Sequence, residues 1–195
     1  MRVTREAAAE SKTRVVAAAS KMLRERGVEP ASIADVMHAA GMTHGGFYKH
    51  FESKNELVRE AIRHAFDDVV GRFDRRSVEN GDPAALAAYV AEYLSPGHVA
   101  EPGVGCPVAA LGGDAGRHSE WLGPAFAAGA EKLIERVART SKGACVGEET
   151  QLRAAAIRTL AQLVGAVVVA RAVGAGPLRG EVLAACAEGV FARSS

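Results

Sequence analysis

Residues 32–54, SIADVMHAAGMTHGGFYKHFESK, constrain the fold more than any other stretch of this chain, because local signals mark where each helix begins and ends. Ser32 is a favourable N-cap, and the aspartate three residues later completes a capping-box pattern. Gly41 stands where a residue in the left-handed conformation commonly ends a helix. Thr43 can cap a second helix of about two turns, and Ser53 opens another capping box. We therefore predict two short helices joined by a tight glycine turn, followed by a longer helix.

The second short helix, residues 43–50, carries several hydrogen-bond donors and no carboxylate. No acidic residue lies between Asp35 and Glu52. Gly45 and Gly46 are poor helix formers, each costing about 1 kcal/mol relative to alanine, so their presence needs a reason. Without side chains they let the helix backbone come close to a base edge or a sugar-phosphate wall. Two short helices joined by a tight turn are typical of the helix-turn-helix motif, whose second helix enters the DNA major groove.

The spacing within this segment also predicts which side chains face inward. Phe47 and Phe51 lie four residues apart, so they share one helix face and are expected to pack against the neighbouring helices. His44, Lys49 and the two glycines then point outward. Lys54 begins the next helix, where its ammonium group adds to the positive helix end and suits a phosphate.

The string GMTHGGFYKHFESKNEL resembles the hallmark segment of the tetracycline-repressor (TetR) family of transcriptional regulators in its spacing, its capping residues and its Tyr-x-His-Phe core. The resemblance implies that His44, Gly45 and Lys49 approach bases. It implies phosphate contacts for Ser32, Thr43, Tyr48, His50 and Lys54. Gly46 belongs to the same DNA-facing set but stands where the family more often has Ser or Thr, so one family contact is absent. Met37 replaces a small alanine, and slightly wider packing is expected there.

Composition and charge limit the class of protein. Hydrophobic residues make up 48% of the 195 residues, which argues against disorder. The longest apolar run, residues 163–170, is broken by a glycine and is too short to span a bilayer. The first residues, MRVTREAAAESK, contain no apolar signal core, so we expect a cytoplasmic protein. Cys106, Cys145 and Cys186 are widely separated and odd in number, which suits a reducing compartment and shows no metal-ligand spacing.

The rest of the chain reads as helices separated by glycine and proline. We predict an all-α protein of about nine helices, with a helix-turn-helix domain at residues 1–53 and a larger ligand-binding and dimerisation domain at residues 54–195. A helix from Lys54 to about Val78 should link the two. The segment from Ser95 to Gly105 is expected to be a loop or a broken helix.

The last two helices, about residues 148–173 and 178–192, are rich in alanine, valine, leucine and glycine. Small residues let helices approach closely, and this apolar surface exceeds what one helix pair can bury. The TetR resemblance implies that the pair meets its copy in a four-helix homodimer interface. A simple core within one chain is the alternative.

Aromatic residues of the larger domain are candidates for a small-molecule site, because such sites are commonly apolar cavities. The candidate ligand-binding residues are Phe66, Tyr89, Tyr93, Cys106, Trp121 and Phe126, with a plain core as the alternative. The segment GCPVAALGGDA, residues 105–115, is similar to a subgroup of regulators that answer to drugs or aromatic compounds. His98 and His118 are expected at the solvated surface, with a polar ligand contact as the alternative.

Catalysis is not expected. The chain contains no GxSxG, HExxH or GxxxxGKS motif, and His44 and His50 lack acidic partners. We expect no cofactor. The resemblance implies a homodimer that binds a palindromic operator, represses transcription and is released by a small apolar or aromatic effector. The alternatives are an activator, a redox- or electrophile-sensing regulator acting through Cys106, or a helical ligand-binding protein without DNA binding.

Overall fold

The computed structural model describes residues 5–141 and 148–191, and every regular element within these ranges is a helix. Cys145 lies outside the described residues. Nine α-helices and two 3-10 helices are described, in the order α1 (Arg5–Arg26), α2 (Ile33–Ala39), η1 (His44–Lys49), α3 (Lys54–Asn80), α4 (Asp82–Tyr93), α5 (Pro96–Ala100), η2 (Pro102–Val104), α6 (Pro107–Arg117), α7 (Ser119–Ser141), α8 (Glu149–Ala172) and α9 (Pro177–Phe191). The predicted all-α class is confirmed.

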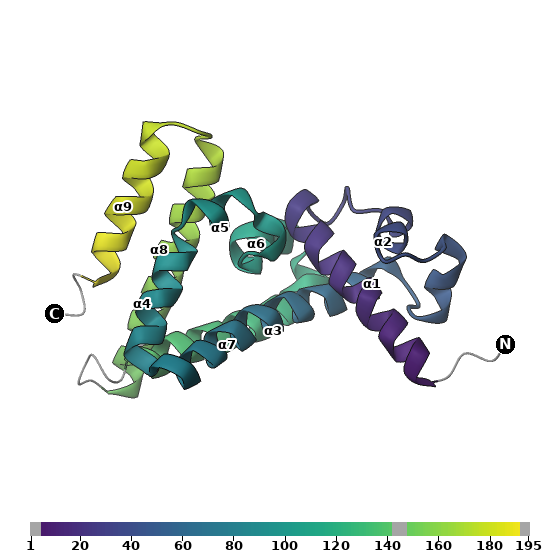
Figure 1. The fold of residues 1–195 in the computed structure, drawn as a ribbon, viewed down its shortest axis with the longest axis horizontal. Coiled ribbons are helices and arrows are strands. Elements are labelled where there is room, and N and C mark those ends of the chain that lie inside the picture. The colour runs from purple at the N-terminus through teal and green to yellow at the C-terminus, as the bar shows by residue number, and fades with distance from the viewer. Residues whose placement is uncertain (1–4, 142–147, 192–195) are drawn as a thin grey trace.

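The first lobe consists of α1, α2, η1 and the start of α3, at the end of the molecule that holds the N-terminus (Figure 1). Gly27 and Gly41, which end α1 and α2, have φ angles of +88° and +72°. Glycine adopts this conformation without the steric penalty that a side chain brings. The Ser32 hydroxyl accepts a 3.1 Å hydrogen bond from the Asp35 amide, as the capping pattern predicts. The predicted helix-turn-helix is present, although its second helix is a 3-10 helix.

The long helix α3 connects this lobe to the rest of the molecule and runs beside α7 (Figure 1). The Ser53 hydroxyl caps α3 by accepting a 3.2 Å hydrogen bond from the Glu56 amide. The Glu56 carboxylate accepts from the Glu52 amide at 2.6 Å, one residue before the capping-box partner that the sequence suggested. Where α3 meets α7, a Cβ built on Gly129 would lie 2.1 Å from the Phe66 ring. The two helices therefore approach too closely for any side chain at Gly129.

The segment between α4 and α6 is a broken helix, in agreement with one of the two predicted alternatives. Helix α4 begins at Asp82, and its N-cap residue is Gly81, with φ +79°. The Ser95 hydroxyl caps the short α5 by accepting from the His98 amide at 3.2 Å. After Ala100 the chain turns through η2 to Gly105, and α6 follows.

Helices α8 and α9 form an antiparallel pair at the end of the molecule opposite the first lobe (Figure 1). The Gln162 side chain donates a 2.8 Å hydrogen bond to the Cys186 carbonyl, and a Cβ on Gly189 would lie 2.8 Å from Gln162. By length and composition α8 could cross a membrane, although it packs on α7 and α9. In the single chain, α8 and the start of α9 have apolar side chains that are exposed to solvent. The large exposed ones on α8, its C-terminal end and α9 are Ile157, Val168, Val169, Val173 and Leu178.

Candidate DNA-binding surface and ligand cavity

The helix η1 displays its polar side chains outward. His44, Gly45 and Lys49 are exposed, and Tyr48 has 71% of its surface accessible. Beneath them Phe47 is completely buried and stacks on Phe51 with ring centroids 5.5 Å apart. The predicted division into an inward aromatic pair and an outward donor-rich face is confirmed. This surface can offer hydrogen bonds and positive charge to a polyanion.

The two glycines of η1 have no packing reason inside the protein. A Cβ on Gly45 would meet nothing within 4 Å. A Cβ on Gly46 would meet only ordinary contacts, the nearest being the Met37 side chain at 3.5 Å and the Met42 side chain at 3.8 Å. An alanine would therefore fit at either position in the isolated chain. The lack of a side chain at both positions therefore agrees with the prediction that DNA approaches the backbone of η1 closely.

The residues predicted to hold phosphates lie in the same lobe, and some of them also have structural partners. The Ser32 hydroxyl is occupied as a helix cap. The Lys54 ammonium donates a 3.1 Å hydrogen bond to the Glu29 carbonyl in the connection between α1 and α2. Thr43 occupies the cap position of η1, but its hydroxyl makes no capping hydrogen bond. His50 is half-buried at the end of η1.

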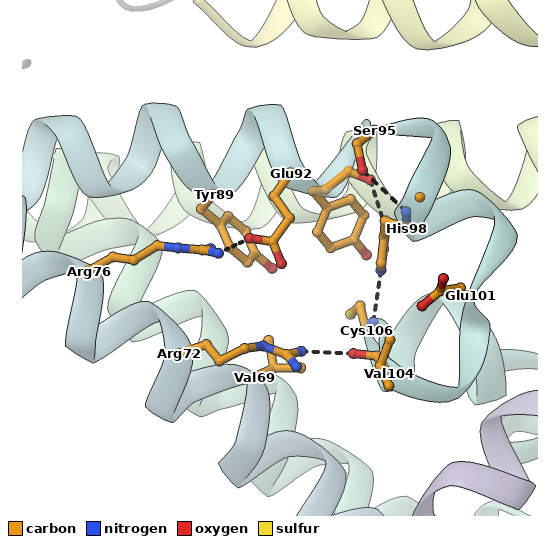
Figure 2. Close-up of a pocket in the computed structure, with 12 residues that line it drawn as sticks. Val69, Arg72, Arg76, Tyr89, Glu92, Ser95, His98, Glu101, Val104 and Cys106 are labelled. Carbon is orange, nitrogen blue, oxygen red and sulfur yellow. Dashed lines mark hydrogen bonds and ion pairs between the residues drawn. The ribbon is translucent and has the colours of Figure 1, made fainter.

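A cavity of about 270 Å³ opens between α3, α4 and the segment from α5 to the start of α6 (Figure 2). It is lined by Val69, Arg72, Arg76, Tyr89, Glu92, Tyr93, Ser95, Gly97, His98, Glu101, Val104 and Cys106. Of the six candidate ligand-binding residues, Tyr89, Tyr93 and Cys106 are among these. The structure therefore brings together half of the predicted set, from two separate parts of the chain.

The other three candidates lie elsewhere. Phe66 packs edge-on against Phe126, with ring centroids 5.3 Å apart, where α3 meets α7. Trp121 lies beside His118, with ring centroids 5.7 Å apart. The His118 imidazole, expected at the solvated surface, is half-buried and lies 3.3 Å from the Glu29 carboxylate, so the end of α6 contacts the first lobe here. Phe66, Trp121 and Phe126 do not line the 270 Å³ cavity, because their rings pack at contacts of α7 with its neighbours.

Arg72 and Arg76 are cavity residues that the sequence analysis missed. They lie four residues apart on α3, on the same helix face as Val69. This spacing could have indicated from the sequence that the two arginines and the valine face the same space. Arg76 of α3 forms an ion pair with Glu92 of α4, and both line the cavity (Figure 2). Arg72 lies 3.1 Å from the Asp68 carboxylate and donates a 2.8 Å hydrogen bond to the Val104 carbonyl.

His98 is half-buried and engaged at both ring nitrogens, which corrects the expectation of a solvated side chain. Its Nδ1 lies 2.7 Å from the Tyr93 carbonyl, and its Nε2 accepts a 3.0 Å hydrogen bond from the Cys106 amide (Figure 2). An Nε2 that accepts carries no proton, so Nδ1 holds the proton and donates it to the carbonyl. Burial lowers the pKa of His98, and the charges of Arg171 and Arg72 act in the same direction. The imidazole is therefore neutral at pH 7.

The buried hydroxyl and thiol groups of the cavity are held in their neutral forms. Burial raises the pKa values of Tyr89 and Tyr93 well above their ordinary value. Burial also raises the pKa of the Cys106 thiol. A reactive cysteine needs the opposite shift, because the thiolate is the nucleophile. Cys106 therefore has the properties of a buried wall residue.

The wall segment 104–106 is fixed by three side chains from three different helices. Arg72 of α3 binds the Val104 carbonyl, and His98 of α5 binds the Cys106 amide. Between them the Gly105 carbonyl accepts a 2.8 Å hydrogen bond from the buried guanidinium group of Arg24, in α1. One wall of the cavity is therefore attached directly to the first helix of the DNA-facing lobe.

Close packing reinforces this attachment. A Cβ on Gly103 would lie 2.5 Å from the Glu25 carboxylate of α1, and a Cβ on Gly105 would lie 2.5 Å from the His98 ring. Farther along, the Asp114 carboxylate accepts a 3.3 Å hydrogen bond from the Val28 amide. The connection after α1 is thus held by α6.

The first lobe is similar in sequence to known proteins. Residues 15–61 match the sequence profile of the family described as "Bacterial regulatory proteins, tetR family". The chain is 34% identical over 70 residues to the HTH-type transcriptional repressor KstR2 of Rhodococcus jostii, covering 36% of this chain and 34% of that protein. It is 39% identical over 62 residues to the HTH-type transcriptional regulator TtgR of Pseudomonas putida, covering 32% of this chain and 30% of that protein. The matches thus span about a third of each relative.

The whole chain is similar in fold to solved structures. A TetR transcriptional regulator from Chloroflexus aurantiacus superposes with a TM-score of 0.75, covering 94% of this chain and 96% of that one. The two sequences are 23% identical, so the likeness concerns the fold.

Proposed function

We propose that this chain, whose residues 15–61 match the tetR-family profile, is a DNA-binding transcriptional repressor released from DNA by a small molecule. It acts in the cytoplasm as a homodimer on a palindromic operator. The observation that carries DNA recognition is the outward face of η1, where donor side chains and the unobstructed Gly45 lie above the buried Phe47. The relatives' printed names, a repressor and a regulator, support the same activity.

The homodimer is supported by the uncovered face of α8 and α9. Exposed valines and a leucine on adjacent helices form the apolar surface that a second copy can bury. A two-fold symmetric pair would present two η1 helices to half-sites about 34–36 Å apart, one turn of DNA. The small residues Ala156 and Ala166 are buried within the chain, whereas Gly165 and Ala185 are exposed. The small residues thus divide between the core and the outer face.

Release by a ligand is supported by the connection between the cavity and α1. A ligand that fits the cavity better in one conformation of the dimer shifts the population toward that conformation. Because Arg24 joins the cavity wall to α1, a shift of the wall changes the position of the DNA-facing lobe. Two η1 helices whose spacing no longer matches the half-sites bind the operator less tightly.

The test is a fluorescence anisotropy titration with labelled DNA from the region flanking the protein's own gene. The parent should bind a palindromic site in preference to a scrambled duplex. The double variant His44→Ala, Lys49→Ala should lose this preference. Arg75→Ala, which removes one exposed cation of α3 outside the lobe, should retain it. Equal binding of both duplexes by the parent would favour a ligand-binding protein without operator recognition.

A further inference from the structure

Two hydroxyl groups at the buried side of the cavity have no hydrogen-bond partner among the described residues. They belong to Tyr89 and Tyr93, whose side chains lie in residues only 6% and 3% exposed. The Cys106 thiol lies beside the Tyr93 hydroxyl, but a thiol is only a weak hydrogen-bond partner. A buried donor left unsatisfied destabilises the protein, because its lost contact with water is not replaced. A ligand that pairs with these two hydroxyls would recover that loss.

The other polar groups around the hydroxyls are already used as acceptors. The Tyr93 carbonyl accepts from His98, and the His98 Nε2 accepts from the Cys106 amide. The Val104 carbonyl accepts from Arg72. What this part of the wall still offers to a ligand is therefore the O–H group of each phenol. A complementary ligand brings an acceptor oxygen.

The charges near Tyr89 favour an acceptor that is negatively charged. The Arg72 and Arg76 side chains lie on the same side of the cavity as Tyr89 (Figure 2). Glu92 pairs with Arg76, whereas the partner of Arg72, Asp68 at 3.1 Å, does not line the cavity, so Arg72 is the cation at this end without a carboxylate partner inside the cavity. Glu101 is exposed and lies at the far end of the view from Arg76 (Figure 2). Hydrogen bonds to an ionised acceptor are roughly twice as strong as those between neutral groups.

Another part of the wall is apolar and aromatic. Tyr89 and Tyr93 line it with ring centroids 5.5 Å apart, and Val69 lies on the facing helix. Phe73, outside the lining, packs against Tyr89 with ring centroids 5.0 Å apart. A cavity of about 270 Å³ is at the small end for a ligand site. We propose that it binds a small aromatic acid whose carboxylate accepts from the Tyr89 and Tyr93 hydroxyls beside Arg72. This inference names the class of effector for the function proposed above and rests on it.

The experiment is isothermal titration calorimetry of the full chain, without DNA, against three probes of similar shape. Benzoate carries a negative acceptor, benzamide a neutral acceptor, and benzylamine a positive donor. The parent should bind benzoate most tightly, benzamide more weakly and benzylamine not at all. The double variant Tyr89→Phe, Tyr93→Phe should lose about tenfold or more in benzoate affinity, because both donors are gone. Thr150→Val, which removes an exposed hydroxyl at the start of α8, should bind benzoate as the parent does.

The same double variant gives a second readout that a general loss of structure would not produce. Removing two unpaired buried hydroxyls should leave the thermal midpoint of the ligand-free protein unchanged or raise it. Benzylamine binding as tightly as benzoate, no benzoate binding at millimolar concentration, or unchanged benzoate affinity in the double variant would each overturn the inference.

These results separate the inference from the proposed function. Release of operator DNA by a different class of compound, without benzoate binding, would leave the function standing and refute the aromatic acid. Benzoate binding in a chain that recognises no operator would do the reverse.

Discussion

Arg24 of α1 and Gly105 of the cavity wall are joined by a 2.8 Å hydrogen bond from a buried guanidinium group to a backbone carbonyl. The two residues are 81 positions apart in the chain. Burial lowers the pKa of Arg24, whose guanidinium also donates to the Ser20 carbonyl and hydroxyl. The bond links the element that would respond to a ligand with the lobe that would respond to DNA. In the function proposed above, this bond couples the cavity wall to the first lobe.

Replacing Arg24 should loosen that link. In Arg24→Ala the Gly105 carbonyl loses its partner, and an unsatisfied buried group costs about 1–3 kcal/mol of the free energy of unfolding. Hydrogen exchange should speed up together in segment 104–106 and at the C-terminal end of α1. Ser20→Ala removes a minor partner of Arg24 and keeps the bond to Gly105, so it serves as the control. Faster exchange in α1 alone would show that the wall is held by other contacts.

Gly45→Ala should separate folding from DNA recognition. Because a Cβ there meets nothing within 4 Å, the variant should be as stable as the parent, or more stable by up to about 1 kcal/mol. Its affinity for the operator should fall, because the added methyl group lies where the helix meets DNA. Chemical denaturation and anisotropy titration measure the two effects. Gly116→Ala, also in open space but on α6, should keep full affinity. Unchanged operator affinity of Gly45→Ala would mean that DNA does not approach this position.

Lys49 and Lys54 should differ in how they contribute to binding. Lys49→Ala should reduce the preference for the operator over random DNA, because its side chain is exposed on η1. Lys54→Ala should weaken binding to all DNA and reduce the salt-dependence slope by about one phosphate. It also removes the bond to the Glu29 carbonyl, so its stability needs to be measured in parallel. Equal affinity of the Lys54 variant and the parent across a salt series would remove Lys54 from the phosphate contacts.

The exposed face of α8 should be the dimer interface. Val168→Glu places a charge in the apolar surface and should shift the protein toward monomer in sedimentation equilibrium, with weaker operator binding as a consequence. Val78→Glu changes a valine that is 88% exposed on α3 and should leave the dimer intact. A parent protein that sediments as a monomer at micromolar concentration would contradict the proposed assembly.

His98 should make the protein less stable in acid. Its pKa in the folded chain lies below the value of about 6.5 for an unfolded histidine, so the unfolded chain binds more protons between these two values. Its contribution to stability is complete above about pH 6.5 and is lost as the pH falls through the folded pKa. His98→Gln should flatten this acid loss in denaturation curves measured at several pH values. His38→Gln, at an exposed position on α2, should keep it. If His98→Gln loses as much stability at low pH as the parent, then another group causes the loss.

The sequence by itself determined the helices and the face of η1. Caps such as Ser32 and Ser53, and stops such as Gly27 and Gly41, act over a few residues, so their effect can be read without knowing the fold. The four-residue spacing of the two phenylalanines, Phe47 and Phe51, likewise set which side is buried.

Only the tertiary structure decided where the cavity lies and what fills its wall. Tyr89 and Phe126 look alike in sequence, as aromatic residues on amphipathic helices, yet only Tyr89 lines the cavity. The difference depends on which helices pack together, and so does the placing of Arg24 beside Gly105. Such contacts join distant parts of the chain, and a local sequence pattern does not indicate which distant residue will be in contact.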